Sequence, residues 1–257
     1  LPLMLALATR QVLRPYGDAL AWGGASLMLL TPLNVWNVIV TTDTALVFFS
    51  VLSALAWWRA ARDDDPRWYL LAGVMLAGAV LSKYFVALLG FAYLVHALVR
   101  PNRRKWGGLL LCYGAVLPAL ALMIWWNSAH CWPNYMFNFV NRHESGRGLN
   151  MTTPLVYLGM MLYVLTPMVI YPLWQRRAAL KVLWHSAHGQ ALLLMAGVPL
   201  LLFAGLSLVK MIGLHWMLSF LPLLLLLLLL VLDEAGMRRV LQWLAGFALL
   251  HMLVFVI

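Results

Sequence analysis

Residues 68–105 read WYLLAGVMLAGAVLSKYFVALLGFAYLVHALVRPNRRK, two apolar stretches that meet at Ser82-Lys83 and end in a basic run. Another basic group, Arg59–Arg67, precedes the first stretch. In a protein that crosses the membrane several times, the breaks rich in Lys and Arg face the cytoplasm. One long crossing would put the two basic breaks on opposite sides. A hairpin that turns at Lys83 puts both on one side, so the charge pattern predicts the hairpin and places Lys83 at its outer end.

The same alternation runs along the whole chain. Of the 18 Lys and Arg residues, 14 fall into every second polar break, in five groups: Arg10 and Arg14; Arg59, Arg62 and Arg67; Arg100, Arg103, Arg104 and Lys105; Arg176, Arg177 and Lys181; Arg238 and Arg239. The intervening breaks hold the other four: Lys83, Arg142, Arg147 and Lys210. The sequence therefore predicts its own topology and isolates a few ionisable groups on the outer face.

Composition indicates an all-α, polytopic integral membrane protein. Hydrophobic residues make up 64% of the chain and charged residues 10%, whereas a soluble domain is about half apolar and about a quarter charged. The formal charge of +10 lies in short loops beside apolar spans, which indicates membrane topology and not nucleic-acid binding.

We expect about nine spans after an N-terminal partial span, Leu1–Thr9: Ala19–Val38, Thr44–Trp58, Trp68–Leu81, Tyr84–Val99, Gly107–Trp126, Pro154–Trp174, Gln190–Val209, Leu214–Leu232 and Val240–Ile257. Residues 1–257 are expected to form a single transmembrane domain, a fragment that lacks its first span and first outer loop. Asn127–Thr153 is expected to be an outer loop with a juxtamembrane helix over Asn134–Arg147, and Arg176–His188 an interfacial helix on the inner surface.

The outer breaks contain a set of ionisable side chains: Asp43, Lys83, His130, Arg142, His143, Glu144, Arg147, Lys210 and His215. Each has a structural interpretation; Asp43, for example, could cap a helix that starts at Thr44, and Lys83 could extend its ammonium to the headgroups. Ionisable groups near lipid are costly, so several around one outer region indicate a site. Lys and Arg suit a phosphate or pyrophosphate, and the carboxylates suit a general base or a metal ligand.

Four stretches carry a family resemblance: Thr41-Thr42-Asp43-Thr44, Leu81-Ser82-Lys83-Tyr84, Trp126–Trp132 followed by Phe137–His143, and Lys210 with His215-Trp216. Their order resembles glycosyltransferase family 39, the protein-mannosyltransferase-like or aminoarabinose-transferase-like group of GT-C membrane enzymes. Thr42 stands where this family usually has proline.

The resemblance implies a GT-C-type helical bundle that moves a sugar from a polyprenyl-phosphate carrier to a glycan, lipid or protein acceptor, with inversion, on the periplasmic face of a bacterial inner membrane. It implies catalytic roles for Asp43 and Glu144, and substrate binding by Lys83, Arg142, Arg147, Lys210 and His215. His143 is a candidate ligand of a divalent cation, although adjacent residues such as His143 and Glu144 point apart on a helix. The family's principal catalytic acid lies in the first outer loop, which would precede Leu1.

Two other classes of function remain open at this stage. A multi-span lipid or glycan transporter or flippase would need ionisable groups near the bilayer midplane on several helices. A non-catalytic membrane scaffold would tolerate substitution of Lys83 and Asp43. The identity of the sugar is not encoded in these patterns.

Overall fold

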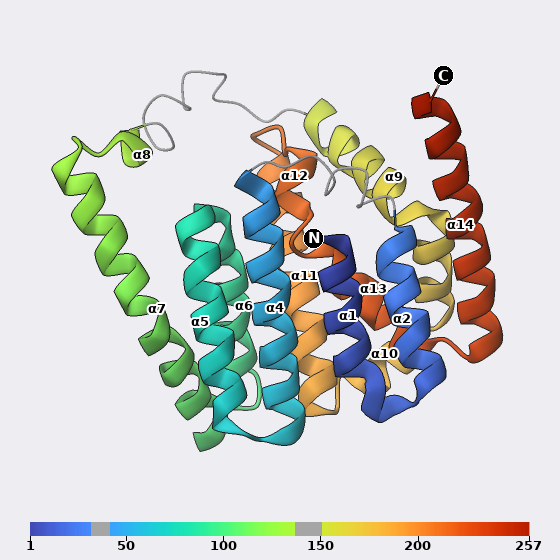
Figure 1. The fold of residues 1–257 in the computed structure, drawn as a ribbon, viewed down its shortest axis with the longest axis horizontal. Helices are drawn as coiled ribbons and strands as arrows, with labels where there is room; N and C mark the ends of the chain where they lie inside the picture. The colour runs from blue at the N-terminus through green and yellow to red at the C-terminus, as the bar shows by residue number, and fades with distance from the viewer. Residues whose placement is uncertain (32–41, 137–150, 257) are drawn as a thin grey trace.

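The computed structural model describes residues 1–31, 42–136 and 151–256, and within these ranges every regular element is a helix. The chain runs through α1 (Pro2–Leu13), η1 (Arg14–Tyr16), α2 (Asp18–Leu30), α4 (Thr42–Asp63), α5 (Pro66–Ser82), η2 (Tyr84–Val86), α6 (Ala87–Leu98), α7 (Arg103–Ala129), α8 (Pro133–Tyr135), α9 (Thr152–Gln175), α10 (Arg177–Leu183), α11 (Ala187–Ser207), α12 (Leu214–Met217), α13 (Leu221–Val231) and α14 (Glu234–Val256). The longer helices stand roughly side by side (Figure 1). The predicted all-helical membrane fold is confirmed.

The predicted hairpin at Lys83 is confirmed. Helix α5 begins with Pro66 in its first turn, where the missing proline N–H costs nothing, and the Asp65 side chain caps it by accepting from the Arg67 backbone N–H. The helix ends because Lys83 is extended, with φ −160° and ψ 149°. The chain then returns through η2 and α6, behind α5 in the view of Figure 1.

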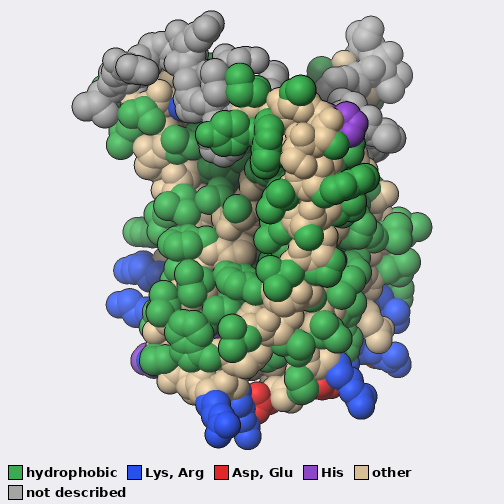
Figure 2. All heavy atoms as spheres, turned by 90° about the vertical axis from the view of Figure 1, so that its left-hand side faces the viewer, with side chains coloured by type: hydrophobic (Ala, Val, Ile, Leu, Met, Phe, Trp, Pro, Cys, Tyr) green, Lys and Arg blue, Asp and Glu red, His purple; other side chains and the backbone are tan. Residues whose placement is uncertain are grey.

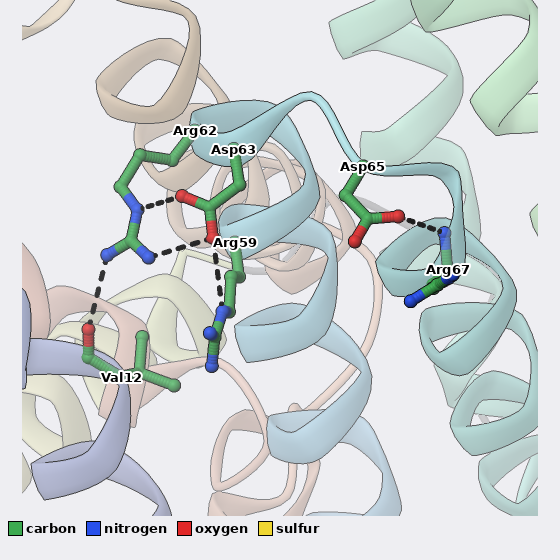
Figure 3. Close-up of polar contacts among 6 residues, drawn as sticks. All are labelled: Val12, Arg59, Arg62, Asp63, Asp65 and Arg67. Carbon is green, nitrogen blue, oxygen red and sulfur yellow. Dashed lines mark hydrogen bonds and ion pairs between the residues drawn. The ribbon is translucent and has the colours of Figure 1, made fainter.

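Contacts between distant segments bring the five basic groups to one end of the bundle. They are Arg62 Nη1 to the Val12 carbonyl at 3.4 Å, Arg104 with Asp64, Arg100 Nη2 with His185 Nδ1 at 3.1 Å, and Arg176 Nη2 with Asp233 Oδ2 at 2.5 Å. Figure 3 shows the first of these beside the Arg59, Arg62 and Asp63 cluster, in which Asp63 accepts from both guanidinium groups. The alternating charge pattern therefore describes the fold correctly.

Four of the described helices are long and apolar enough to cross a membrane: residues 43–63, α7, α9 and α11. Shorter apolar helices of 10–17 residues accompany them, so multi-pass character is clear, while the count of nine spans stays a prediction. Helix α7 exposes large apolar side chains such as Leu110, Leu117 and Trp125, and hydrophobic side chains cover much of the face shown in Figure 2. That surface is suited to lipid.

Two predicted spans differ from the structure. The expected span Leu214–Leu232 is divided between two helices: α12 ends at Met217 and α13 begins at Leu221, with Pro222 in its first turn. Proline lacks an N–H and fixes φ, so it starts a helix more readily than it continues one. Helix α9 is kinked at Thr166, whose φ is +56°, immediately before Pro167.

The leucine run of residues 223–230 packs inside the bundle, where Leu226 and Leu228 are fully buried. Helix α13 contacts α2, α4, α9, α10 and α11. Short α13 thus forms part of the core around which the longer helices stand, and it connects the basic end with the end that carries α12 (Figure 1).

Candidate functional site

An ion pair joins two of the predicted site residues at the end of the bundle opposite the basic groups. Lys83 Nζ lies 2.5 Å from Asp43 Oδ1. The Lys83 side chain is 25% exposed and the Asp43 side chain 17% exposed. The pair is therefore sheltered but still reachable from outside, as a site for a charged ligand requires.

Local structure explains why these two side chains meet. Asp43 lies in the first turn of α4, which begins at Thr42, two residues before the Thr44 start that would have made Asp43 the N-cap. A carboxylate there is stabilised by the positive end of the helix dipole. Lys83 occupies the extended break between α5 and η2, and α4 packs against α5 along their length. The hairpin turn thus delivers the ammonium to the start of α4.

An aromatic cluster links the Lys83 turn to α12. The Phe85 ring lies 4.3 Å from the Trp216 ring, centroid to centroid, and Phe203 packs against both at 6.5 and 6.0 Å. Phe220 extends the cluster at 6.0 Å from Phe203. Trp216, Phe203 and Phe220 are buried. The cluster fixes the late His-Trp element beside the turn that carries Lys83.

His215 and Lys210 belong to the segment that this cluster anchors. His215 is in the four-residue helix α12, partly exposed, with its ring 6.1 Å from the Trp216 ring. Lys210 is partly exposed in the loop after α11, and it has no ion-pair partner within the described ranges. The structure therefore brings Asp43 and Lys83 into contact. The contact between Phe85 and Trp216 places the helix that carries His215 beside the turn that follows Lys83.

The remaining predicted residues lie outside the described residues: Arg142, His143, Glu144 and Arg147. The same holds for most of the expected juxtamembrane helix, of which α8 covers only the start. His130, at the end of α7, stacks on Trp126 with 4.4 Å between ring centroids. The α7 end diverges from α4 and α12 in Figure 1, so His130 is not part of the Asp43–Lys83 pair.

The described residues do not form a metal centre. No group of three or more His, Cys, Asp or Glu side chains among them could hold a metal ion. The carboxylate at this end of the described structure, Asp43, is engaged by Lys83. The expectation of a divalent cation at His143 falls on residues that are not described.

Sequence reasoning missed the aromatic cluster beneath the pair. In the sequence Phe85 and Phe203 are ordinary apolar residues of two spans, and the contacts of Phe85 with Phe203 and with Trp216 each span well over 100 positions. The sequence signal for this cluster is the position of Phe85, two residues after Lys83, because an aromatic residue just after a turn can pack against the neighbouring segment.

Comparison with known proteins gives a family match over the N-terminal part of the chain. Residues 3–126 match the family model described as dolichyl-phosphate-mannose-protein mannosyltransferase. The match contains Asp43, Lys83 and the helices that hold them, whereas Lys210 and His215 lie beyond it. No curated protein and no solved structure matches the chain.

Proposed function

We propose, on the premise that this chain is a membrane glycosyltransferase of the protein-mannosyltransferase-like type, that it moves a sugar from a polyprenyl-phosphate carrier to an acceptor on the periplasmic face of a bacterial inner membrane. The observation that carries the proposal is the sheltered pair between Asp43 and Lys83, which lies inside the matched segment and at the end opposite the basic groups. By the topology rule, that end is the outer one.

The proposed reaction is a displacement at the anomeric carbon. The acceptor hydroxyl oxygen forms the new bond to that carbon, a carboxylate takes the hydroxyl proton, and the bond to the carrier phosphate breaks with its electron pair leaving on the phosphate. Attack from the face opposite the leaving group inverts the configuration, as in glycosidases that invert. Asp43 and Glu144 are the proposed carboxylates in this chain.

Lys83 is the proposed partner of the leaving phosphate. A positively charged group aimed at the oxygen on which charge develops stabilises the transition state more than the ground state. Asp43 orients the Lys83 ammonium at 2.5 Å, so it acts on the phosphate through Lys83 as well as being a candidate base. Arg142, Arg147, Lys210 and His215 are proposed to complete the phosphate site.

The buried ionisable groups favour a transferase over a flippase. Among the described residues, His96 and Lys105 are buried, and both lie near the basic end, in the last turn of α6 and the first turn of α7. A flippase would be expected to hold ionisable groups near the middle of the membrane on several helices.

Binding of the carrier tests the phosphate site directly. Native mass spectrometry in detergent would compare retention of polyprenyl phosphate by the wild type and by the double variant Lys83→Ala with Lys210→Ala. A matched control, Lys181→Ala with Arg103→Ala, removes two charges at the basic end. Saturable binding that is lost only in the first variant supports the proposal, whereas equal retention by all three proteins contradicts it.

Transfer is tested by glycosylation of the acceptor in cells. Asp43→Asn and Lys83→Ala should each reduce transfer at unchanged protein level, and silence of both variants would defeat the enzyme interpretation. A divalent cation held with the help of His143 is a further part of the proposal. Chelation with EDTA should then abolish transfer and added Mg²⁺ or Mn²⁺ should restore it; transfer that is indifferent to EDTA would remove the metal from the mechanism.

A further inference from the structure

A polar cavity lies at the basic end of the bundle, remote from the Asp43–Lys83 pair. Its volume is about 260 Å³, larger than the space of one water molecule, about 30 Å³. The side chains that matter are Asp64, Tyr69, His96, Asn102, Arg104 and Lys105. Asp64, Asn102 and Arg104 are exposed, whereas Tyr69, His96 and Lys105 are buried. The cavity therefore has a charged mouth and a buried polar floor.

The floor presents a hydrogen-bond donor that has no partner. The Trp57 indole N–H donates to His96 Nδ1 at 3.2 Å, and indole can only donate. Nδ1 is thus the acceptor of a neutral ring, and Nε2 carries the proton. That Nε2–H is buried and makes no hydrogen bond of ordinary geometry, although the Ala187 backbone interacts with the ring. A buried donor without a hydrogen-bond partner is costly, so this position favours a ligand that accepts hydrogen bonds.

Lys105 adds a buried positive charge to the same floor. Its Nζ donates to the carbonyls of His96 and Val99, at 3.2 and 2.8 Å, and to Gln190 Oε1 at 2.9 Å. All three acceptors are neutral, so no carboxylate compensates the ammonium within this set. The contact to Oε1 also fixes the Gln190 amide, whose Nε2 is buried without a partner. These three bonds use all the ammonium protons, so Lys105 gives the floor a positive charge and not a free donor.

The mouth of the cavity also favours an anion, but the Asp64 carboxylate competes for its guanidinium. Helix α7 begins here: the Asn102 side chain accepts from the Lys105 backbone N–H, and the positive end of a helix dipole favours an anion. Arg104 extends from this turn and pairs with Asp64. The Asp64 carboxylate thus holds the guanidinium at the mouth and competes with any other anion for it.

We infer that this cavity binds the phosphate group of an anionic phospholipid from the membrane leaflet at the basic end. Phosphate oxygens accept several hydrogen bonds at once and match Arg and Lys donors. Basic pockets between membrane helices on the cytoplasmic side are suited to lipid headgroups. Immediately after Arg104 and Lys105, α7 exposes Trp106 and Leu110, which offers the acyl chains an apolar surface next to the mouth.

Native mass spectrometry with defined lipids tests the inference. The probe is phosphatidylglycerol, and diacylglycerol with the same acyl chains is the control without phosphate. Arg104→Gln removes a donor whose side chain is 77% exposed, and Arg103→Gln removes a neighbouring exposed charge that does not line the cavity. We expect Arg104→Gln to weaken binding of one phosphatidylglycerol about tenfold, the effect of losing roughly one charge-assisted hydrogen bond, with Arg103→Gln unchanged.

A variant with the opposite sign guards against loss of folding as the explanation. Asp64 has φ +57°, a conformation that asparagine tolerates, so Asp64→Asn should keep the turn. It removes the competing carboxylate and frees Arg104, so binding should tighten severalfold. The inference would be overturned if Asp64→Asn bound phosphatidylglycerol more weakly than the wild type does. It would also be overturned if all variants retained phosphatidylglycerol and diacylglycerol equally.

Inorganic phosphate separates the two sources of the same chemistry. If millimolar phosphate displaces the single bound phosphatidylglycerol from the wild type, and this displacement is lost in Arg104→Gln, the cavity recognises the headgroup phosphate. Thermal stabilisation by phosphate alone, with no retained lipid, would support the phosphate site and assign it to a soluble phosphate. Absence of both effects would contradict the site itself.

Discussion

The pair between Lys83 and Asp43 should contribute measurable stability as well as function. We consider Asp43→Asn, Lys83→Met and the double variant, which keep side-chain size nearly constant. Exposed ion pairs couple by about 0.2–1 kcal/mol, and breaking a buried pair costs about 3–5 kcal/mol. With 17% and 25% of the two side chains exposed and 2.5 Å between Nζ and Oδ1, we expect a coupling energy of about 1–2 kcal/mol between these limits.

The assay is a double-mutant cycle on unfolding of the purified protein in detergent. Each single variant should lower the unfolding midpoint, and the double variant should lower it by no more than the worse single variant. The control cycle uses Arg176→Met and Asp233→Asn, a pair at the other end with 46% and 54% exposed side chains, where solvent screening should leave little coupling. Additive single effects at Asp43 and Lys83 would refute the argument that the sheltered pair is a structural unit.

Three further predictions follow from packing, aromatic contact and charge. Gly73→Ala should destabilise by about 1–3 kcal/mol, because its Cβ would lie 2.3 Å from the Cys112 carbonyl oxygen; Gly114→Ala, with no heavy atom within 4 Å of the new Cβ, should be neutral or slightly stabilising in the same unfolding assay, and an equal loss in both would contradict the packing argument. Trp216→Leu should lower stability by about 2–4 kcal/mol. It should also weaken carrier binding more than the matched Trp243→Leu on the exposed side of α14 does; unchanged carrier binding in Trp216→Leu would contradict a role of the aromatic cluster at the site. The pKa of Asp233 is lowered by the Gly236 backbone N–H and then by Arg176, so its contribution is present above the ordinary carboxyl pKa and is lost as pH falls through the lowered value. Asp233→Asn should therefore reduce the unfolding midpoint at pH 7, and the difference from wild type should shrink as the pH falls below the ordinary carboxyl pKa; a difference that grows on acidification would show the sign to be wrong.

Charge pattern was sufficient to predict the hairpin at Lys83 because the rule depends only on which breaks are basic. The same rule gave no information about the break between Met217 and Leu221, since that stretch is apolar on both sides and carries no charge. Pro222 indicates the start of a new helix, but the unbroken apolar length of the stretch favours one continuous span. The charge pattern therefore predicts turns that carry charged residues, and it cannot predict a break between helices inside an apolar stretch.

Lys105 shows a different limit of the same reasoning. The sequence places it among the basic groups of a loop, together with Arg103 and Arg104, and nothing in the pattern separates the three. In the structure the two arginines are exposed, while Lys105 turns inward to Gln190 from α11, 85 positions away. Burial of one member of a charge cluster depends on a partner that only the tertiary fold supplies.

The two sheltered lysines differ in what faces them, and this difference separates their expected roles. Lys83 is neutralised by Asp43, so a phosphate that approaches it must compete with a carboxylate already in place. Exchange of one anion for another costs little net charge, which suits a ligand that arrives and leaves in every turnover. Lys105 faces neutral oxygens, so a phosphate there would supply a missing negative charge to a buried cation. We therefore expect carrier phosphate at Lys83 to exchange rapidly, and phospholipid at the Lys105 cavity to survive purification; delipidation that removes both at the same rate would contradict this distinction.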